Sequence, residues 1–190
     1  RTYCVFNVDQ CEGEALDKFR VVDDPAGATA FPDFEPADQL IAATGADIRY
    51  GGQACFYQQP TPFGSWPNHS DGDFICLPKK RQFHSAASFY EAAFHELSHW
   101  SEVRLGWDRK KGGYALGELI AELSACYIAA ELGIPHADEL TNHAAYLRSW
   151  LNAMKEDASF VFRATAQASK AADFLMEFAR KEASVSVEVA

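Results

Sequence analysis

A chain of 190 residues with 48% hydrophobic and 13% aromatic content can form a substantial apolar core, which excludes a disordered protein and favours one domain. Its formal net charge is −10, and its only basic clusters are short ones at 79–81 and 109–111, which argues against direct binding of duplex nucleic acid. No apolar run approaches the ~20 residues of a membrane span, so no membrane partner is expected.

The cysteines and the start of the chain bear on the cellular compartment. Five cysteines are an odd number, and none forms a C-x-x-C pair, which disfavours a disulfide framework and a thiolate zinc site. We therefore expect reduced thiols in a cytoplasmic protein. The chain starts with Arg1 and shows no signal-like segment, which indicates a piece of a longer protein.

The N-terminal half has the pattern of short strands separated by turns. β-forming residues alternate with segments rich in Gly and Pro, a spacing typical of a small antiparallel sheet. The expected strands are 2–8, 47–50, 54–58 and 73–77. One helix is expected among them at 36–44, with Pro in its first turn and Gly45 at its end.

From Ser85 onward the pattern becomes helical. Ser85 is a suitable N-cap for the first long helix, and Gly133, with Pro135 beyond it, ends the second. Strands first and helices later indicate an α+β domain. The long helices are expected around 89–103 and at 114–132, 143–154 and 160–182.

The most informative stretch is His95-Glu96-Leu97-Ser98-His99, in the first long helix. Histidines four residues apart project from one side of a helix, so both imidazoles can reach one ion. Glu96 lies about a third of a turn away, close enough to take a proton from a water that the ion activates. This H-E-x-x-H spacing is typical of metal-dependent hydrolases, with zinc as the preferred ion and manganese as the alternative.

The same helix predicts the direction in which the histidines point. At 100° per residue an apolar arc lies opposite His95 and His99, whereas Glu91 and Glu102 flank them. We therefore expect the arc to anchor the helix and the histidines to face a polar cleft. The arc consists of Ala86, Phe89, Tyr90, Ala93, Phe94, Leu97 and Trp100.

A third ligand is expected from the second long helix. Glu118 and Glu122 are four residues apart on one side, and their spacing leaves either one as the ligand. The run E-x-x-A-E resembles the pattern of glutamate-type zincins, which implies that Glu118 binds the ion and that Glu122 holds a histidine. Small side chains near the glutamates would let the two helices approach closely; they are Ala121, Ala125 and Ala129.

Several ordered blocks of the sequence resemble the C-terminal domain of ArdC-type antirestriction proteins. The same domain occurs in TraC-type plasmid primases and in polyvalent proteins of phages and conjugative elements. The matching blocks are 94–100, 114–123, 142–150 and 170–174, together with 73–78 before the active-site helix. Residues 5–13 resemble the junction that follows the N-terminal single-stranded-DNA-binding domain of the family.

The resemblance implies a zincin-like metallopeptidase fold, in which a small antiparallel or mixed sheet precedes a helical half that carries the H-E-x-x-H motif. It divides the chain into a junction at 1–13, the zincin-like domain at 14–183 and a tail at 184–190. Single-stranded DNA would then be bound only through the N-terminal domain, which this chain lacks.

The function implied by motif and resemblance together is that of a zinc-dependent peptidase domain in an antirestriction-type protein of a mobile element. His95, His99 and Glu118 would hold the ion, and Glu96 would be the general base that activates water against a peptide bond. The substrate would be a protein or peptide.

Further residues are candidates for contacts with the substrate. Tyr114, His143 and Tyr146 could stabilise the oxyanion. The strand near Ile75 could pair through its edge with an extended peptide.

Two other functions stay open. A non-enzymatic, metal-containing antirestriction module could protect incoming DNA, with its acidity competing for the DNA-binding surface of a restriction enzyme. A secreted toxin peptidase is the third alternative, which the odd cysteine count and the missing signal disfavour.

Overall fold

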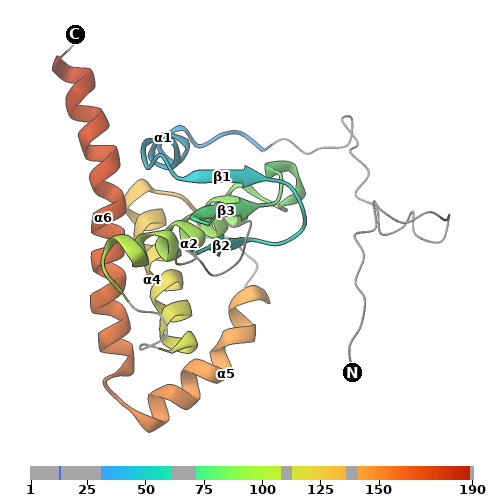
Figure 1. Ribbon diagram of the computed structural model, residues 1–190, viewed down its shortest axis with the longest axis vertical. Helices are drawn as coiled ribbons and strands as arrows, with labels where there is room; N and C mark the ends of the chain where they lie inside the picture. The colour runs from blue at the N-terminus through green and yellow to red at the C-terminus, as the bar shows by residue number, and fades with distance from the viewer. Residues whose placement is uncertain (1–12, 14–30, 61–71, 108–112, 136–140, 189–190) are drawn as a thin grey trace. The chain divides into compact units, whose positions relative to one another are not determined.

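The computed structural model describes residue 13 and residues 31–60, 72–107, 113–135 and 141–188, except for the side chains of 141–146 and 182–188. The elements lie in the unit Phe31–Ala190. In chain order they are α1 (Glu35–Ala43), β1 (Asp47–Tyr50), β2 (Phe56–Gln58), β3 (Phe74–Leu77), the short 3-10 helix η3 (Lys80–Gln82), α2 (Ala86–Arg104), α4 (Tyr114–Leu132), α5 (Thr141–Glu156) and α6 (Phe160–Glu188) (Figure 1). The strand expected at 2–8 lies outside the described residues.

The three strands form one mixed sheet in the order β1-β3-β2. β1 runs parallel to β3, with Ile48 opposite Ile75, and β2 runs antiparallel to β3, with Tyr57 opposite Ile75. The α+β class is confirmed. β3 lies between β1 and β2, which are neighbours in sequence. The sheet is mixed because β3 runs in the same direction as β1 and in the opposite direction to β2.

The central place of β3 corrects one expectation. Ile75 belongs to a strand that is paired on both sides, so its backbone has no open edge for a peptide. Within the described residues β2 pairs only with β3, which makes β2 an edge strand, and it also contacts α2. Short strands of similar composition give no signal in the sequence that separates a central strand from an edge strand.

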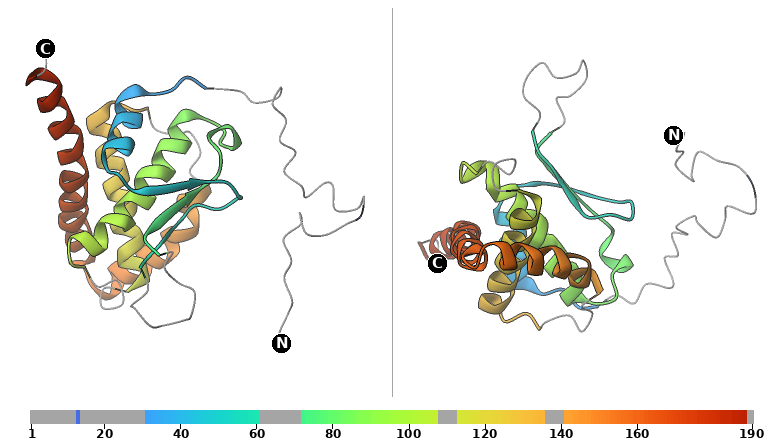
Figure 2. Two further views of the ribbon diagram at one scale, coloured as in Figure 1. Left: turned by 45° about the horizontal axis from the view of Figure 1, so that its top comes forward. Right: turned by 90° about the horizontal axis from the view of Figure 1, so that it is seen from below.

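Helix α2 lies against the sheet on one side and against α4 and α6 on the other (Figures 1 and 2). It begins as predicted, because the backbone N–H of Ser88 donates to Oγ of Ser85 at 3.1 Å. Its histidine side faces α4, the helix from which the third ligand and a close approach were expected. Ser98, His99 and Glu102 are buried along with the apolar arc.

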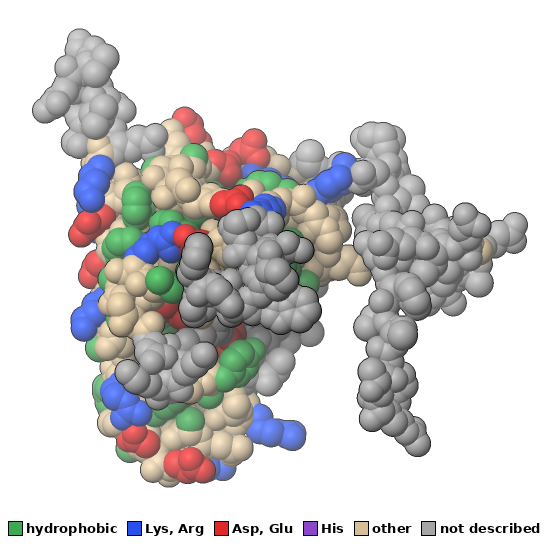
Figure 3. Space-filling view, viewed as in Figure 1, with side chains coloured by type: hydrophobic (Ala, Val, Ile, Leu, Met, Phe, Trp, Pro, Cys, Tyr) green, Lys and Arg blue, Asp and Glu red, His purple; other side chains and the backbone are tan. Residues whose placement is uncertain are grey.

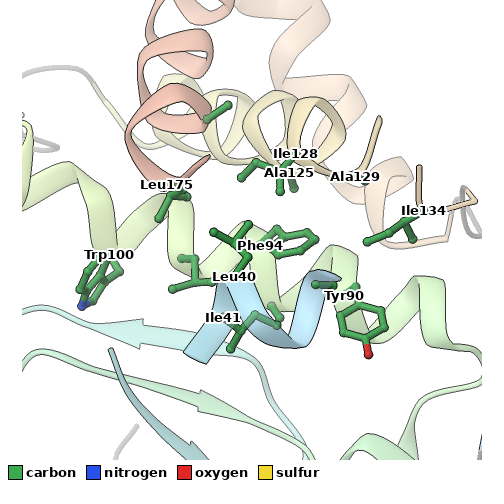
Figure 4. Close-up of a cluster of buried hydrophobic side chains, with 14 of the residues drawn as sticks. Leu40, Ile41, Tyr90, Phe94, Trp100, Ala125, Ile128, Ala129, Ile134 and Leu175 are labelled. Atoms are coloured by element: carbon green, nitrogen blue, oxygen red, sulfur yellow. The ribbon is translucent and has the colours of Figure 1, made fainter. Parts of the chain in front are cut away.

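The main core is built from the apolar arc of α2 and the helices around it. Phe94 lies at its centre, with Leu40 of α1, Ile128 of α4 and Leu175 of α6 around it (Figure 4). All four side chains are fully buried. Burying each of them contributes roughly 1.5–3 kcal/mol, so this cluster fixes α2 firmly between sheet and helices.

A second, smaller cluster joins α4, α5 and α6. Trp150 of α5 packs near Ile120 and Phe160, and its indole N–H donates to the carbonyl oxygen of Ala115 at 3.1 Å. These contacts fix the first turns of α4, the helix that carries the two glutamates. Trp150 is buried here, and Trp100 is buried as its place in the predicted apolar arc of α2 indicated.

The helix ends agree with the predicted signals at α4 and depart from them at α6. Gly133 ends α4 with a φ of +74°, a left-handed conformation that glycine adopts without strain. α6 continues past the predicted end at Glu182 to Glu188.

Two expectations from the composition concern membrane helices and surface charge. Within the described residues, no helix combines the length and the apolarity that crossing a membrane requires. Acidic and basic side chains alternate along the edge formed by α6, where Arg180 pairs with Glu131 at 3.0 Å (Figure 3). The negative charge is thus not gathered into one patch on this edge.

Candidate metal centre

Helices α2 and α4 bring two histidines and one glutamate together. His95 and His99 lie one turn apart on α2, and their Nε2 atoms are 3.1 Å apart. Oε2 of Glu118 on α4 lies 3.5 Å from Nε2 of His95, and its Oε1 lies 3.6 Å from Nε2 of His99. One ligand atom from each of the three residues falls within 4.8 Å of the others.

These separations bring three ligand groups round one point. Ligand atoms about 2.0–2.2 Å from one zinc ion in tetrahedral geometry are roughly 3.3 Å apart. The two Nε2 atoms, both on α2, are 3.1 Å apart, and Glu118 of α4 approaches each of them with a different carboxylate oxygen, at 3.5 and 3.6 Å, so one ion could be shared after small side-chain movements. The donor set also fits, because two imidazoles and a carboxylate suit zinc and manganese alike.

The far nitrogens of both imidazoles are also held by carboxylates. Nδ1 of His99 lies 2.7 Å from Oε1 of Glu102, and both side chains are buried. Nδ1 of His95 lies 3.5 Å from Oε1 of Glu122. A carboxylate on Nδ1 fixes the ring and leaves Nε2 facing the ion site, the usual arrangement around metal-binding histidines.

Glu102 is the residue that the sequence reasoning missed. It was placed beside the histidines on the helix, but no role was given to it. The signal was available, since Glu102 follows His99 by three residues and therefore lies on the same side of α2.

The site holds more acidic than basic groups, and these groups shift the pKa values of His95 and Glu118. Burial alone would lower the pKa of His95, but its hydrogen bonds with Glu118 and Glu122 raise it to about 10. Burial would raise the pKa of Glu118, whereas its contacts with His95 and His99 hold the pKa of this carboxyl well below its ordinary range. A buried carboxylate cluster of this kind is stabilised by a cation, whether a proton or a metal ion.

Glu96 lies between the candidate ligands His95 and His99 and the sheet. It is buried, and burial raises the pKa of its carboxyl, with His95 and His99 acting in the opposite direction. The backbone N–H of Tyr57, in the middle of β2, donates a hydrogen bond to the Glu96 carboxylate. The predicted base thus contacts the edge strand of the sheet.

The two helical glutamates occupy different places. Glu118 reaches both Nε2 atoms, whereas Glu122 reaches the opposite nitrogen of His95. Glu118 therefore has the position that a third ligand would need, and its role as a ligand stays a prediction.

Of the other predicted catalytic groups, only Tyr114 has a described side chain. Tyr114 is the first residue of α4, and its side chain is 63% exposed. His143 and Tyr146 belong to α5, but their side chains lie outside the described residues. A role for these three residues in stabilising the oxyanion stays a prediction.

Among the described cysteines, two have thiols with raised pKa values, Cys55 and Cys126. Cys55, Cys76 and Cys126 are free cysteines, whereas Cys4 and Cys11 lie outside the described residues. Burial, with Glu96 nearby, raises the pKa of the Cys55 thiol to about 11. A thiol of this kind is protonated near neutral pH and is a poor nucleophile.

Fold and site together define a metallopeptidase-type domain of the zincin class. The chain belongs to the zincin-like metallopeptidase family, whose model matches residues 35–167. This finding confirms the family that the ordered sequence blocks indicated.

The most informative relatives come from plasmids and bacteria. The antirestriction protein ArdC of plasmid R388, solved in a Mn(II)-bound form, is 41% identical, with a TM-score of 0.60 over 78% of this chain and 53% of that one. Its metal-free structure is 40% identical, with the same TM-score. The DNA primase TraC of Escherichia coli is 38% identical over 78% of this chain, and the Sinorhizobium fredii protein y4eC is 29% identical over 92% of it.

The matches cover only part of each relative. The chain spans 13% of TraC and 53% of y4eC, and about half of ArdC. The resemblance to ArdC and TraC that the sequence blocks indicated is therefore confirmed for one domain of larger proteins.

Proposed function

We propose that this domain is a metal-dependent peptidase. The convergence of His95, His99 and Glu118, with one ligand atom of each within 4.8 Å of the others, carries the proposal. A largely buried polar cluster with four carboxylates close to two imidazoles costs stability unless a cation compensates it. Such a cluster is thus better explained by a metal function than by packing.

In this proposal each residue has a definite task. His95, His99 and Glu118 hold a divalent ion, zinc or manganese, while Glu102 and Glu122 orient the two rings. The ion supplies Lewis-acid chemistry, which polarises a carbonyl and lowers the pKa of a water.

Glu96 moves the proton. Its carboxylate takes a proton from the attacking water, whose oxygen bonds to the carbonyl carbon of the substrate. When the C–N bond breaks, the same proton passes to the leaving nitrogen. Burial raises the pKa of Glu96, which brings the base closer to the pH at which it must both accept and release a proton.

The substrate in this proposal is an extended segment of protein or peptide. β2 is the edge strand of the sheet within the described residues and contacts Glu96 through Tyr57. An extended peptide that adds to this edge as a further strand would pass close to the base.

The biological setting is proposed from the relatives. Similarity to ArdC of plasmid R388 and to TraC supports a role in an antirestriction-type protein of a mobile element. Single-stranded DNA would be bound by another part of such a protein.

The test compares wild-type protein with Glu96→Gln and His95→Ala. We expect elemental analysis to find one zinc or manganese ion per chain in the wild type and in Glu96→Gln, but none in His95→Ala. We expect proteolysis of a peptide library by the wild type alone. If wild type and Glu96→Gln cleave equally, or if neither cleaves while Glu96→Gln still protects incoming DNA in cells, the domain is not a peptidase. The second result would identify a non-enzymatic antirestriction module instead.

A further inference from the structure

A chain of polar contacts links the edge strand to the far end of α2. Tyr57 lies in the middle of β2, and its hydroxyl donates to Oδ1 of Asp73 at 2.8 Å. Asp73 in turn accepts from Nη1 and Nη2 of Arg104 at 3.2 and 2.7 Å. Arg104 is the last residue of α2, so the contacts run from the sheet to the helix that carries the metal ligands.

The Arg104 end of this chain of contacts is anchored on α2. The Arg104 guanidinium lies 3.4 Å from the centroid of the Trp100 ring, and its Nη1 donates to the carbonyl oxygen of Trp100 at 2.8 Å. Trp100 itself is buried beside α6. A planar guanidinium with this double contact holds one position, which a flexible ammonium could not do as well.

Asp73 has an unusual backbone. Its φ of +75° is, within the described part of the chain, the only positive value at a non-glycine residue. Its N–H donates to the carbonyl oxygen of Gln58 at 2.8 Å, which joins the end of β2 to the start of β3. A non-glycine backbone in this left-handed conformation persists only where surrounding contacts favour it. The hydrogen bonds of the Asp73 carboxylate with Tyr57 and Arg104 are such contacts.

The same strand also contacts the site directly. The backbone N–H of Tyr57 bonds Glu96, and Nε2 of Gln59 lies 3.5 Å from Oε2 of Glu102, the residue that holds His99. Tyr57 therefore contacts Asp73 through its hydroxyl and Glu96 through its backbone. A shift of β2 along α2 would therefore move the outward backbone groups of β2 relative to Glu96.

From these contacts we propose that Tyr57, Asp73 and Arg104 form a strand clamp, a set of positioning residues that fixes β2 in register with Glu96. The clamp sets where a peptide added to β2 lies relative to the ion site. It leaves the metal ligands untouched, because His95, His99 and Glu118 are held by the packing of α2 on α4. The catalytic part of the inference rests on the proposed peptidase function, whereas its structural part does not.

The first test measures register in the zinc-loaded protein by amide hydrogen exchange. Tyr57→Phe and Arg104→Gln should each accelerate exchange of the residue 57 amide at least about tenfold, while amides 94–100 change less than about twofold. Tyr50→Phe and Arg163→Gln are matched controls: the first removes an exposed tyrosine hydroxyl from β1, the second an exposed arginine that pairs with Asp157 at 2.5 Å. Both controls should leave residue 57 unchanged. Equal acceleration in β2 and α2 would show a general loss of stability and would overturn the clamp.

The second test measures kinetics on a fluorogenic peptide that the wild type cleaves, chosen from a random-sequence library. Each clamp variant should lower kcat/KM at least about tenfold with zinc content unchanged. The double variant should lose no more kcat/KM than the more impaired of the two single variants, because both side chains act through Asp73. Losses that multiply, or unchanged kinetics, would overturn the positioning role. If the wild type cleaves no peptide, the peptidase proposal fails, and the exchange measurement still decides whether the clamp exists.

Discussion

Nδ1 of His99 lies 2.7 Å from Oε1 of Glu102, and both side chains are buried in the interface of α2 with its neighbours. The two residues are three apart on one helix, so the helix that supplies two ligands also supplies the acid that orients one of them. The ring of His99 is therefore fixed before any ion arrives. Preorganisation of this kind raises metal affinity because less side-chain freedom is lost on binding.

The contact with His99 predicts the effect of removing the Glu102 charge. Glu102→Gln should weaken zinc binding about 10–100-fold, the usual effect of losing such a partner. Competition with a chromophoric chelator measures the affinity. Glu177→Gln, an exposed glutamate that pairs with Lys181 on α6, is the matched control and should bind zinc like the wild type. Equal affinities in the wild type and Glu102→Gln would remove the orienting role.

Glu118 and Glu122 should differ in the same measurement. Glu118→Ala removes a proposed ligand and should weaken zinc binding more than about 100-fold, whereas Glu122→Ala removes a contact to the far side of His95 and should cost about tenfold. The reverse order would make Glu122 the third ligand.

Much of this site could be predicted from the sequence because helix geometry is local. The spacing of His95 and His99 fixes their common side, and the spacing of Glu118 and Glu122 does the same on α4. The apolar arc of α2 was predicted correctly for the same reason, from Phe89 to Trp100.

The parts that could not be predicted depend on contacts between distant segments. Nothing local states that β3 lies between β1 and β2, so the strand of Ile75 was wrongly given an open edge. The depth at which His99 and Glu102 are buried also follows from tertiary packing and not from periodicity.

Metal should stabilise the folded domain. An ion that binds only the native state raises the free energy of unfolding by about 2.7 kcal/mol at a free concentration 100-fold above Kd. Thermal melts with zinc and with excess EDTA should therefore differ clearly in the wild type. His95→Ala should melt at the same temperature under both conditions, and a persistent difference there would place the ion elsewhere.

Asp73 should make stability depend on pH. The hydrogen bond from Arg104 holds the pKa of Asp73 below its ordinary value of 3.8, with burial opposing and Tyr57 assisting this effect. The unfolded chain therefore binds this proton more tightly, so the contribution is full above about pH 5 and is lost as the pH falls through 3.8 and then through the lowered pKa.

Asp73→Asn isolates that contribution. The carboxylate is partly exposed, so the wild type should exceed this variant by no more than about 1 kcal/mol at pH 7. The difference should shrink as the pH falls below 3.8. Urea unfolding at several pH values measures it, and a difference that grows in acid would contradict the sign.

The core around Phe94 should be sensitive to truncation. Phe94→Ala leaves a cavity between α1, α2, α4 and α6 and should cost about 3–5 kcal/mol in the free energy of unfolding. Phe162, which is 74% exposed on α6, is the matched control, and Phe162→Ala should change stability by less than about 0.5 kcal/mol. Urea unfolding compares the two variants, and similar losses would contradict the described core.

The most direct measurement is anomalous diffraction at the zinc edge from crystals of this domain grown with zinc. The proposed site predicts one strong peak between α2 and α4, about 2.0–2.2 Å from Nε2 of His95, Nε2 of His99 and a carboxylate oxygen of Glu118. A strong peak bound by other residues, or no peak at these three atoms under saturating zinc, would contradict the central claim.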